Sequence, residues 1–555
     1  MRPARLGRAA ATTLAAALPL AFLAIFFALP VGGMLVRGLL PDGHLDLSGF
    51  GEVLGRARTQ RIVGFTLGMA GIATVVTVLV GVPVAHALYR LALPGRRILR
   101  ALVVMPFVLP TVVVGVMFRS LLAPGGLLGG LGLDGSWQAI LAAYVFFNLA
   151  VVVRTVGGAW EGLDRRMEEA AAALGAGPWT VFRTVTLPAL LPAIVSAASV
   201  VFLFCATAFG VVLVLGGLDY GTVETEIYVL TTSMLDLRGA AVLSVLQFAA
   251  VAAMLVVADR TRVRRGAGMP GGSRAARGAV APGRITAYAT GSLLVTAVAV
   301  VFVGLPVFAL VGRSFTRSGE WTWENYRALG ALDGHHTVAV TVWEAVITSW
   351  RIAVDAALVA VVLGLLVAVL VTRPAHTPGQ ARRRRLLDAL VMVPLGVSAV
   401  TVGFGFLVTL DRPPLDLRSS PVLVPLAQAM VALPLVVRTL TPVLGAVDDR
   451  QRQAAATLGA TPVRVWLTVD LPVVWRPLLA AVGLALAVSL GEFGATSFLV
   501  RPDQPTLPVV VYRLLGRPGA DTFGMALAAA VVLSLMTVVV MGLVERLRVS
   551  SVGAF

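Results

Sequence analysis

Lysine is absent from this chain of 555 residues, so arginine supplies all 45 of its basic side chains. A P-loop ATPase needs a lysine, in the motif G-x-x-x-x-G-K-[ST], to hold the β- and γ-phosphates of its nucleotide. This chain cannot supply that lysine. Any ATP hydrolysis of that kind must occur in another protein, and we predict that the chain itself is not an enzyme.

Cysteine and histidine are also scarce. The single cysteine, Cys205, excludes an intramolecular disulfide and a metal site built from a cysteine cluster. The five histidines are scattered along the chain, so the sequence lacks the metal or nucleophile cluster that an intramembrane enzyme needs. We predict no catalytic residue, no metal site and no bound cofactor.

Charged side chains make up only 13% of the residues and hydrophobic ones 58%, with a mean hydropathy of +0.90. Soluble domains carry about 25% charged residues, so much of the surface must face an apolar medium. Residues 14–36 contain no charge, and a helix of that length crosses the roughly 30 Å hydrocarbon layer of a bilayer. The composition predicts a polytopic integral membrane protein in contact with lipid.

Apolar runs recur along the whole chain and predict an all-α fold with twelve transmembrane helices in two sets of six. The first set covers residues 14–37, 62–89, 100–121, 138–157, 191–217 and 239–258. The second set covers residues 286–312, 346–372, 387–409, 421–445, 477–500 and 521–544.

The net charge of +17 does not indicate nucleic-acid binding, because the arginines lie in short segments between the apolar runs. Such placement is typical of cytosolic loops, which are rich in basic residues. If the N-terminus is cytosolic, the arginine-rich segments 2–8, 90–100 and 382–385 all lie on the cytosolic side. Both termini are then cytosolic. The first apolar run exceeds the roughly 7–15 residues of a cleavable signal peptide, so we expect an uncleaved first helix.

The two sets of helices are tandem repeats. A shift of 284 residues aligns 149–155 (LAVVVRT) with 433–439 (LPLVVRT). The same shift continues without a gap to Tyr228 and Tyr512. Agreement over so many ungapped positions indicates two parallel copies of one helical unit.

The repeat predicts three parts. Residues 1–258 form a first six-helix unit and residues 286–555 a second. Between them, residues 259–285 hold seven arginines among glycine, proline, serine and alanine. Such a segment cannot bury enough apolar surface to fold, so we predict a cytosolic linker.

The most polar stretch of each repeat follows its fourth apolar run, at 165–188 and at 450–472. Each begins with an alanine-rich helix, which Gly175 or Gly459 ends. A nearby proline then begins a second short helix at its first turn, and Leu-Pro leads into the fifth span. We predict a helix–turn–helix on the cytosolic face, with a flat alanine side that another protein can approach closely.

Both stretches resemble the EAA loop of bacterial ABC-importer permeases, EAA-x3-G-x9-I-x-LP. Val185 takes the isoleucine place in the first repeat, where the other matching residues are Glu169, Ala170, Ala171, Gly175, Leu187 and Pro188. In the second repeat the matching residues are Gln453, Ala454, Ala455, Gly459, Leu471 and Pro472. Gln453 replaces the glutamate, which puts an ion pair there in doubt but neither the helix nor the turn.

This resemblance implies a type I (MetI-like) importer fold and a role as the transmembrane permease subunit of a bacterial ABC importer. In that family the loop is a coupling helix, which seats in a groove of a separate ATPase subunit that uses ATP and magnesium. The resemblance also implies two ATPase subunits, an external solute-binding protein and a location in the bacterial cytoplasmic membrane.

Two six-helix units in one chain resemble the fused permeases of the thiamine and iron(III) importers. Strings such as 145–149 (VFFNL) and 489–494 (SLGEFG) are more similar to the thiamine type. The implied solute is thiamine or a thiamine phosphate, with iron(III) as the alternative. A secondary transporter driven by an ion gradient would be expected to carry proton or sodium ligands at mid-membrane. It would also leave the doubled loop unexplained, as would a structural or assembly protein.

Three further residues are candidates for the solute pathway. Glu492 lies in the eleventh predicted helix between two glycines, where it either faces a cationic solute or forms local hydrogen bonds. Tyr228 and Tyr512 occupy the same place in both repeats, near external helix ends. Interfacial anchoring is the alternative role for a tyrosine at such a place.

Overall fold

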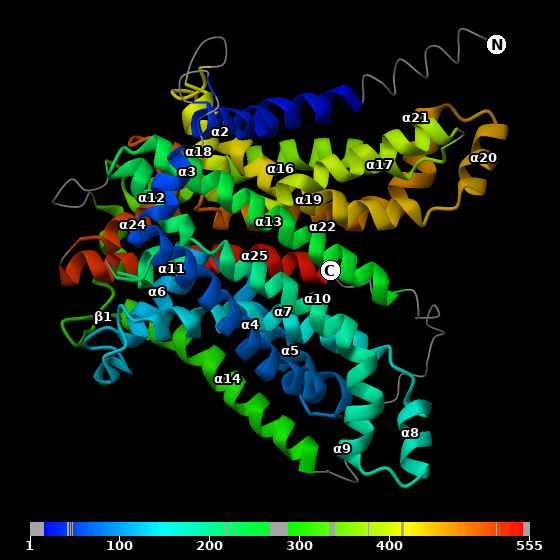
Figure 1. Cartoon of the computed structure of the whole chain (residues 1–555), viewed down its shortest axis with the longest axis horizontal. Helices are drawn as coiled ribbons and strands as arrows, with labels where there is room; N and C mark the ends of the chain where they lie inside the picture. Colours follow the sequence, from blue (N-terminus) through cyan, green and yellow to red (C-terminus); the bar gives the residue numbers. More distant parts are fainter. Residues whose placement is uncertain are drawn as a thin grey trace. The chain divides into compact units, whose positions relative to one another are not determined.

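The computed structural model describes residues 16–40, 44, 46, 48–217, 219–266, 287–331, 339–375, 377–411, 416–517 and 519–547. Most of the predicted linker lies outside these residues. The described chain is almost entirely helical, with one antiparallel pair of two-residue strands, β1 (Thr316–Arg317) and β2 (Glu320–Trp321) (Figure 1). The predicted all-α class is confirmed.

Helices alternate with short breaks along the chain. The first repeat contains η1 (Ala24–Ala28), α2 (Leu29–Leu39), α3 (Ser48–Gly55), α4 (Ala57–Arg90), α5 (Arg96–Val104), η2 (Met105–Val108), α6 (Thr111–Leu122), η3 (Gly129–Leu131), α7 (Trp137–Glu161), α8 (Arg165–Ala173), α9 (Pro178–Val181), η4 (Phe182–Thr186), α10 (Leu187–Ala206), α11 (Gly210–Leu215), α12 (Val223–Thr232) and α13 (Leu237–Gly266). The second repeat contains α14 (Ala287–Ser314), α15 (Glu324–Arg327), η5 (Ala328–Gly330), α16 (Val342–Thr372), α17 (Pro378–Met392), η6 (Val393–Gly396), α18 (Ala399–Thr409), α19 (Leu423–Gly445), α20 (Asp449–Thr457), α21 (Pro462–Val465), η7 (Trp466–Asp470), α22 (Leu471–Gly491), α23 (Thr496–Leu499), α24 (Leu507–Leu515) and α25 (Ala520–Leu547).

Within the described ranges, ten helices are long and apolar enough to cross a membrane, and the number of spans rises to twelve if each of two bent helix pairs counts as one span. The pair Arg96–Val108 and Thr111–Leu122 bends by 106°, and the pair Pro378–Gly396 and Ala399–Thr409 bends by 97°. Both pairs replace the third helix that the sequence predicted in its set. In each pair a 3₁₀ turn, η2 or η6, carries a proline near its start, and proline cannot donate the hydrogen bond that would continue an α-helix.

The fifth span of each repeat begins and ends earlier than predicted, at Pro178–Ala206 and Pro462–Gly491. α10 ends at Ala206 and α22 ends at Gly491, and a very short helix, α11 or α23, follows each break. Two further short helices, α12 and α24, begin 284 residues apart. Hydropathy did not predict them, because ten residues or fewer are too short to register as a span.

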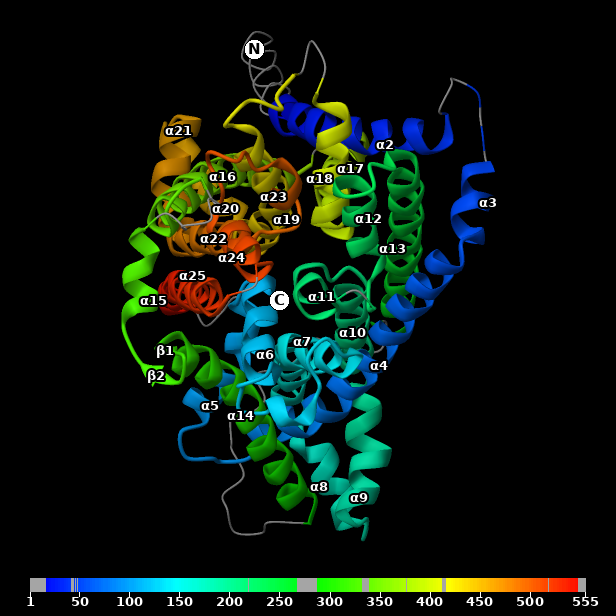
Figure 2. The ribbon, with the colours of Figure 1, turned by 90° about the vertical axis from the view of Figure 1, so that its left-hand side faces the viewer.

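By packing, the chain divides into two compact units, which are described separately. The first-repeat unit contains Leu54–Glu226 and Ala249–Trp323, and the second-repeat unit contains Met1–Val53, Ile227–Phe248 and Glu324–Gly553. In the first-repeat unit α14 packs on α4 and α6 (Figure 2), and in the second-repeat unit α2 packs on α18. Each unit therefore takes its first long helix from the other repeat. The division at 258 and 286 follows the repeat in the sequence and stays a prediction.

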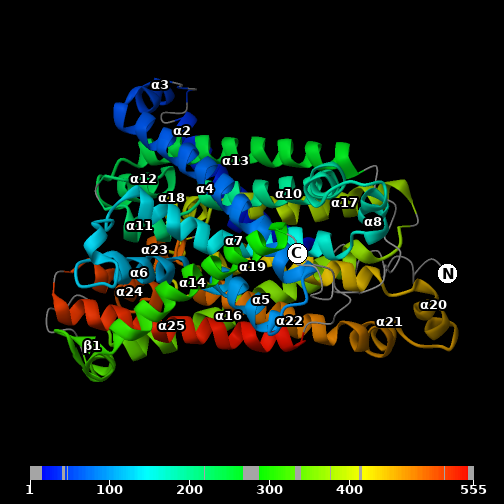
Figure 3. The ribbon, with the colours of Figure 1, turned by 90° about the horizontal axis from the view of Figure 1, so that it is seen from below.

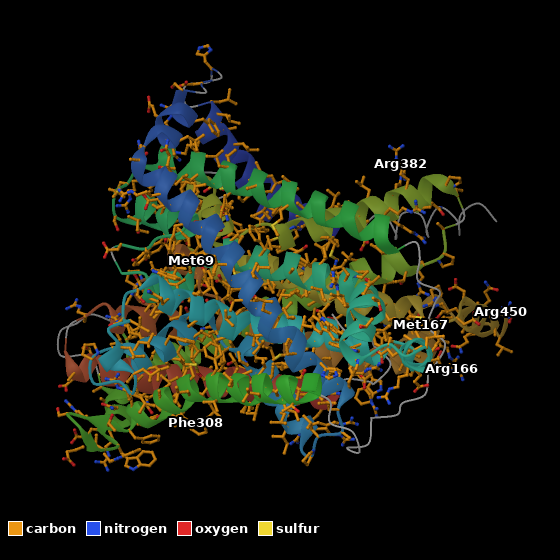
Figure 4. All side chains as sticks on the ribbon, turned by 60° about the horizontal axis from the view of Figure 1, so that its bottom comes forward. Met69, Arg166, Met167, Phe308, Arg382 and Arg450 are labelled. Atoms are coloured by element: carbon orange, nitrogen blue, oxygen red, sulfur yellow. The ribbon has the colours of Figure 1, made fainter. Side chains whose placement is uncertain are left out.

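The core of each unit lies between its long helices. In the second-repeat unit α16 packs on α19 and α22, and α22 packs on α25 (Figure 3). Gly364 of α16 lies so close to Val436 of α19 that a Cβ would clash, and Gly81 of α4 meets Val152 of α7 in the same way. Small residues at such crossings let the backbones of membrane helices approach closely. Large apolar side chains stand on the outside, such as Phe308, which is 77% exposed (Figure 4), as a surface in contact with lipid requires.

Candidate functional site

The first EAA-like segment lies at one end of the first-repeat unit, away from the β1–β2 hairpin (Figure 1). The carboxylate of Asp164 accepts a hydrogen bond of 3.0 Å from the N–H of Arg166 and caps α8. Gly175 ends the helix with a φ of +87°. The N–H of Ala176 then donates to the carbonyl of Ala171 at 3.1 Å, which closes a Schellman turn.

The second EAA-like segment has the same construction in the second-repeat unit, at the end away from α24 (Figure 1). Asp448 caps α20 by accepting a hydrogen bond of 2.9 Å from the N–H of Arg450. Gly459 has a φ of +83°, and the N–H of Ala460 donates to the carbonyl of Ala455 at 3.1 Å. The helix, turn and second short helix that the sequence predicted are present in both repeats.

A leucine stands exposed at the outer point of each turn. Leu174 is 90% exposed and Leu458 is 88% exposed, and both immediately precede the turn glycine. Glu169 and Gln453 are exposed as well. Figure 4 labels Arg166 on α8 and Arg450 on α20, whose side chains project outward at the ends of their units. Each segment thus presents an apolar tip beside polar side chains.

Polar contacts fasten the inner side of α8 to its unit. Glu168 Oε2 forms an ion pair with Arg90, the last residue of α4. Glu168 Oε1 accepts a hydrogen bond of 2.8 Å from the Thr186 hydroxyl of η4. Arg90 and Thr186 are both buried, so this contact holds α8 against two other elements of the unit.

A different set of side chains fastens α20. Asp470 of η7 is fully buried, and its carboxylate accepts hydrogen bonds of 2.8 Å from Arg452 Nε and from Arg373 Nη2. Arg452 Nη1 also donates to Asp449 Oδ1 at 2.6 Å. Burial lowers the pKa of Arg452, but the hydrogen bonds to the two carboxylates outweigh that effect, so its pKa lies above the usual value.

The three candidate pathway residues lie around one break in the second-repeat unit, between α22 and α23. Glu492 Oε1 accepts a hydrogen bond of 2.7 Å from the N–H of Ala495. Glu492 Oε2 accepts hydrogen bonds from the N–H of Thr496, at 3.0 Å, and from its hydroxyl. The buried carboxylate therefore caps the start of α23, which is the local role that the sequence left open.

Both candidate tyrosines contact phenylalanines, one in the same break and one in α23 directly after it. The ring of Tyr228 meets Phe498 edge to face, with 5.3 Å between ring centroids. The ring of Tyr512 lies 5.5 Å from that of Phe493. The fold thus gathers side chains from α12, α24 and the α22–α23 break. In the described part of the chain, no three His, Cys, Asp or Glu side chains are grouped to hold a metal.

Comparison with known proteins places these features in a family. Residues 78–262 match the family described as "Binding-protein-dependent transport system inner membrane component". The molybdenum transport system permease protein ModB of Azotobacter vinelandii is 35% identical over 162 residues, which cover 28% of this chain and 72% of that protein. The chain belongs to this family.

The likeness extends over most of the permease. The thiamine transport system permease protein ThiP of Brucella abortus is 28% identical over 513 residues, or 89% of each chain. The crystal structure of a bacterial ABC transporter involved in the import of alginate aligns with this chain at 16% identity and a TM-score of 0.40. The alignment covers 44% of this chain and 92% of the aligned chain of that structure.

The chain is thus a multi-pass inner membrane permease of an ABC importer, a family whose permeases are not themselves enzymes. The sequence correctly located both helix–turn–helix segments of this permease. It missed Leu174 and Leu458, although both stand at the same place beside a turn glycine. It also missed Glu168, whose spacing from Arg90 gives no sign that the two meet.

Proposed function

We propose that this permease imports thiamine or a thiamine phosphate and that its two EAA-like segments are coupling helices for ATPase subunits. One observation carries the coupling role: the same turn, with the same backbone hydrogen bonds, occurs twice. A turn needed only to reverse the chain would not have to expose a leucine. Burying such a side chain in a partner's groove is worth about 1.5–3 kcal/mol.

Two ATPase subunits and an external solute-binding protein complete the proposed transporter. Glu169, Ala170, Ala171 and Gly175, followed by Leu187 and Pro188, meet one ATPase. The second ATPase meets Gln453, Ala454, Ala455 and Gly459, followed by Leu471 and Pro472. The two ATPases close on ATP and magnesium, the permease opens outward to receive solute, and hydrolysis resets it. This assignment places both segments and both termini in the cytosol.

Thiamine is proposed because the similarity to the Brucella abortus protein, which is named as a thiamine permease, covers most of both chains. We also propose that Tyr228, Tyr512 and the break at Glu492 border the solute pathway. The ring contacts at that break support this assignment. Aromatic faces attract cations such as the thiazolium ring of thiamine.

Cysteine cross-linking tests the coupling role. Cys205 is the single cysteine and is buried, so Cys205→Ala gives a cysteine-free parent. Ala171→Cys and Ala455→Cys in that parent should each cross-link to a co-expressed ATPase subunit. A cysteine at exposed Leu127 serves as the control and should not react with the ATPase. Failure of both positions to capture an ATPase, or labelling of either from outside the cell, would overturn the proposal.

Uptake by the complete transporter tests the solute. In proteoliposomes with its ATPase and binding protein, the permease should accumulate labelled thiamine only when ATP is present. Excess unlabelled thiamine should compete, and iron(III) should not. Uptake of iron(III) in place of thiamine would reject the solute but not the coupling role. Uptake by the chain alone, driven by an ion gradient, would reject both.

A further inference from the structure

The contacts that fasten the two coupling helices carry opposite charges at matching positions. A shift of 284 residues places Glu168 on Arg452 and Thr186 on Asp470. The acid thus lies on the coupling helix in the first repeat and on the following turn in the second. We call Arg90, Glu168 and Thr186 the first latch, and Arg373, Arg452 and Asp470 the second latch.

Each latch contains one arginine at the end of a long helix, and this arginine is the same in both repeats. Arg90 ends α4 and Arg373 directly follows α16. In the first latch, Arg90 meets the carboxylate of Glu168 on the coupling helix. In the second, Arg373 meets Asp470 on the turn, and Asp470 in turn binds the coupling helix through Arg452.

Three charges of the two latches are buried and therefore depend on their partners. Arg90 is 7% exposed, Arg452 is 8% exposed and Asp470 is fully buried. A buried charge that loses its partner is strongly destabilising. The first residue of each coupling helix, three positions earlier, is exchanged in the same way, because Arg165 stands where the second repeat has Asp449. The charges within each latch therefore complement one another. A residue of one latch cannot replace its counterpart in the other latch unless the remaining residues are exchanged with it.

The long helices α4 and α16, which carry or precede the latch arginines Arg90 and Arg373, also hold a short helix nearer their other end. The N–H of Val223, which begins α12, donates to Thr66 Oγ1 of α4 at 3.1 Å. The N–H of Leu507, which begins α24, donates to Ser349 Oγ of α16 at 2.7 Å. Thr66 lies 24 residues before Arg90, and Ser349 lies 24 residues before Arg373, which is about 36 Å along a helix.

We propose that the two latches are positioning devices that transmit displacement of each coupling helix to one long membrane helix, α4 or α16. That helix in turn moves α12 or α24, which begin at its far end. The inference rests on the proposed coupling function and adds the residues that carry the motion. Complementary charge within a latch, and not the identity of any one residue, is what the transmission requires.

Transplanting one latch into the other repeat tests this requirement. In the complete transporter, Glu168→Arg places an arginine beside Arg90, and we expect thiamine uptake to fall at least about tenfold because a buried charge is left uncompensated. The triple variant Arg165→Asp/Glu168→Arg/Thr186→Asp recreates the second latch around Arg90. We expect it to restore uptake to within about twofold of the parent, since the changes are coupled through direct contact.

The mirror set provides the matched control. Arg452→Glu alone should lower thiamine uptake. Asp449→Arg/Arg452→Glu/Asp470→Thr should restore uptake, because it recreates the first latch around Arg373. Glu168→Gln, which keeps the shape of the side chain, gives a milder variant if a charge reversal prevents folding. It should lower the number of thiamine molecules imported per ATP hydrolysed.

Two measurements separate the latch from the coupling role on which it rests. Cross-linking at Ala171→Cys reports whether the ATPase still docks, and the ratio of thiamine imported to ATP hydrolysed reports transmission. A normal cross-link with a lowered ratio, restored in the triple variant, supports the latch. A normal cross-link with no rescue, or with an unchanged ratio in the single variants, overturns the latch alone. Absence of the cross-link in the parent overturns both proposals.

Discussion

The two EAA-like segments share a backbone but differ in how they are anchored. Both have an aspartate cap, both turn at a glycine of positive φ, and both expose the leucine before it. Beneath them, Glu168 lies where the other segment has Arg452. The outer sides of the two segments share the cap, the turn and the exposed leucine, although Gln453 stands where the first segment has Glu169, whereas the inner contacts carry exchanged charges. A surface that meets a partner and a surface that packs on its own unit are under different constraints.

The largest effect on transport itself is expected at the turn glycines. Gly175→Val or Gly459→Val forces a branched residue into the left-handed region, which costs an L-residue about 1–2 kcal/mol. No atom lies near a Cβ at either glycine, so backbone strain alone is responsible. Transport should fall about 5- to 30-fold, with normal insertion into the membrane. Gly175→Asn is the control, since asparagine tolerates this conformation. Wild-type uptake by both valine variants would remove the turn from the mechanism.

The exposed leucines should affect ATPase binding instead of the turn itself. Leu174→Asp or Leu458→Asp removes the apolar tip. Neither change should disturb the fold, because both leucine side chains are almost fully exposed. Loss of roughly 1.5–3 kcal/mol of burial should weaken ATPase binding about 10- to 100-fold, measured by co-purification at graded dilution. Leu174→Met should bind nearly as well as the parent. If only one of the two aspartate variants loses the ATPase, the outer faces are less equivalent than their exposure indicates.

The smallest effect concerns the cap of the second short helix. Thr461 caps α21 by accepting a hydrogen bond from Arg464, whereas Gly177 at the matching place has no side chain to cap α9. Thr461→Ala should destabilise α21 by about 1 kcal/mol, and Gly177→Thr should stabilise α9 by less. Hydrogen exchange at the amides of each short helix measures the change. Equal protection of the two parent helices would show that packing, and not the cap, sets their stability.

Much of this permease is readable from its sequence, because membrane spans and tight turns depend on local chemistry. Low charge and long apolar runs placed the spans, since a bilayer requires about twenty apolar residues per helix. Glycine and proline placed the turns of the two EAA-like segments. The same local signals misjudged the bent third spans, because hydropathy measures the apolar length of a segment and not its direction.

Tertiary structure decided which distant residues meet. Hydropathy does not show that α14 packs with the first repeat, or that Arg90 reaches across 78 residues to Glu168. Nor does it show that Glu492 turns inward to cap α23. Sequence alone determined where this chain crosses the membrane and where it turns, since those depend on neighbours along the backbone. Only folding decided how its buried charges are paired, because pairing depends on distances between helices that no local pattern records.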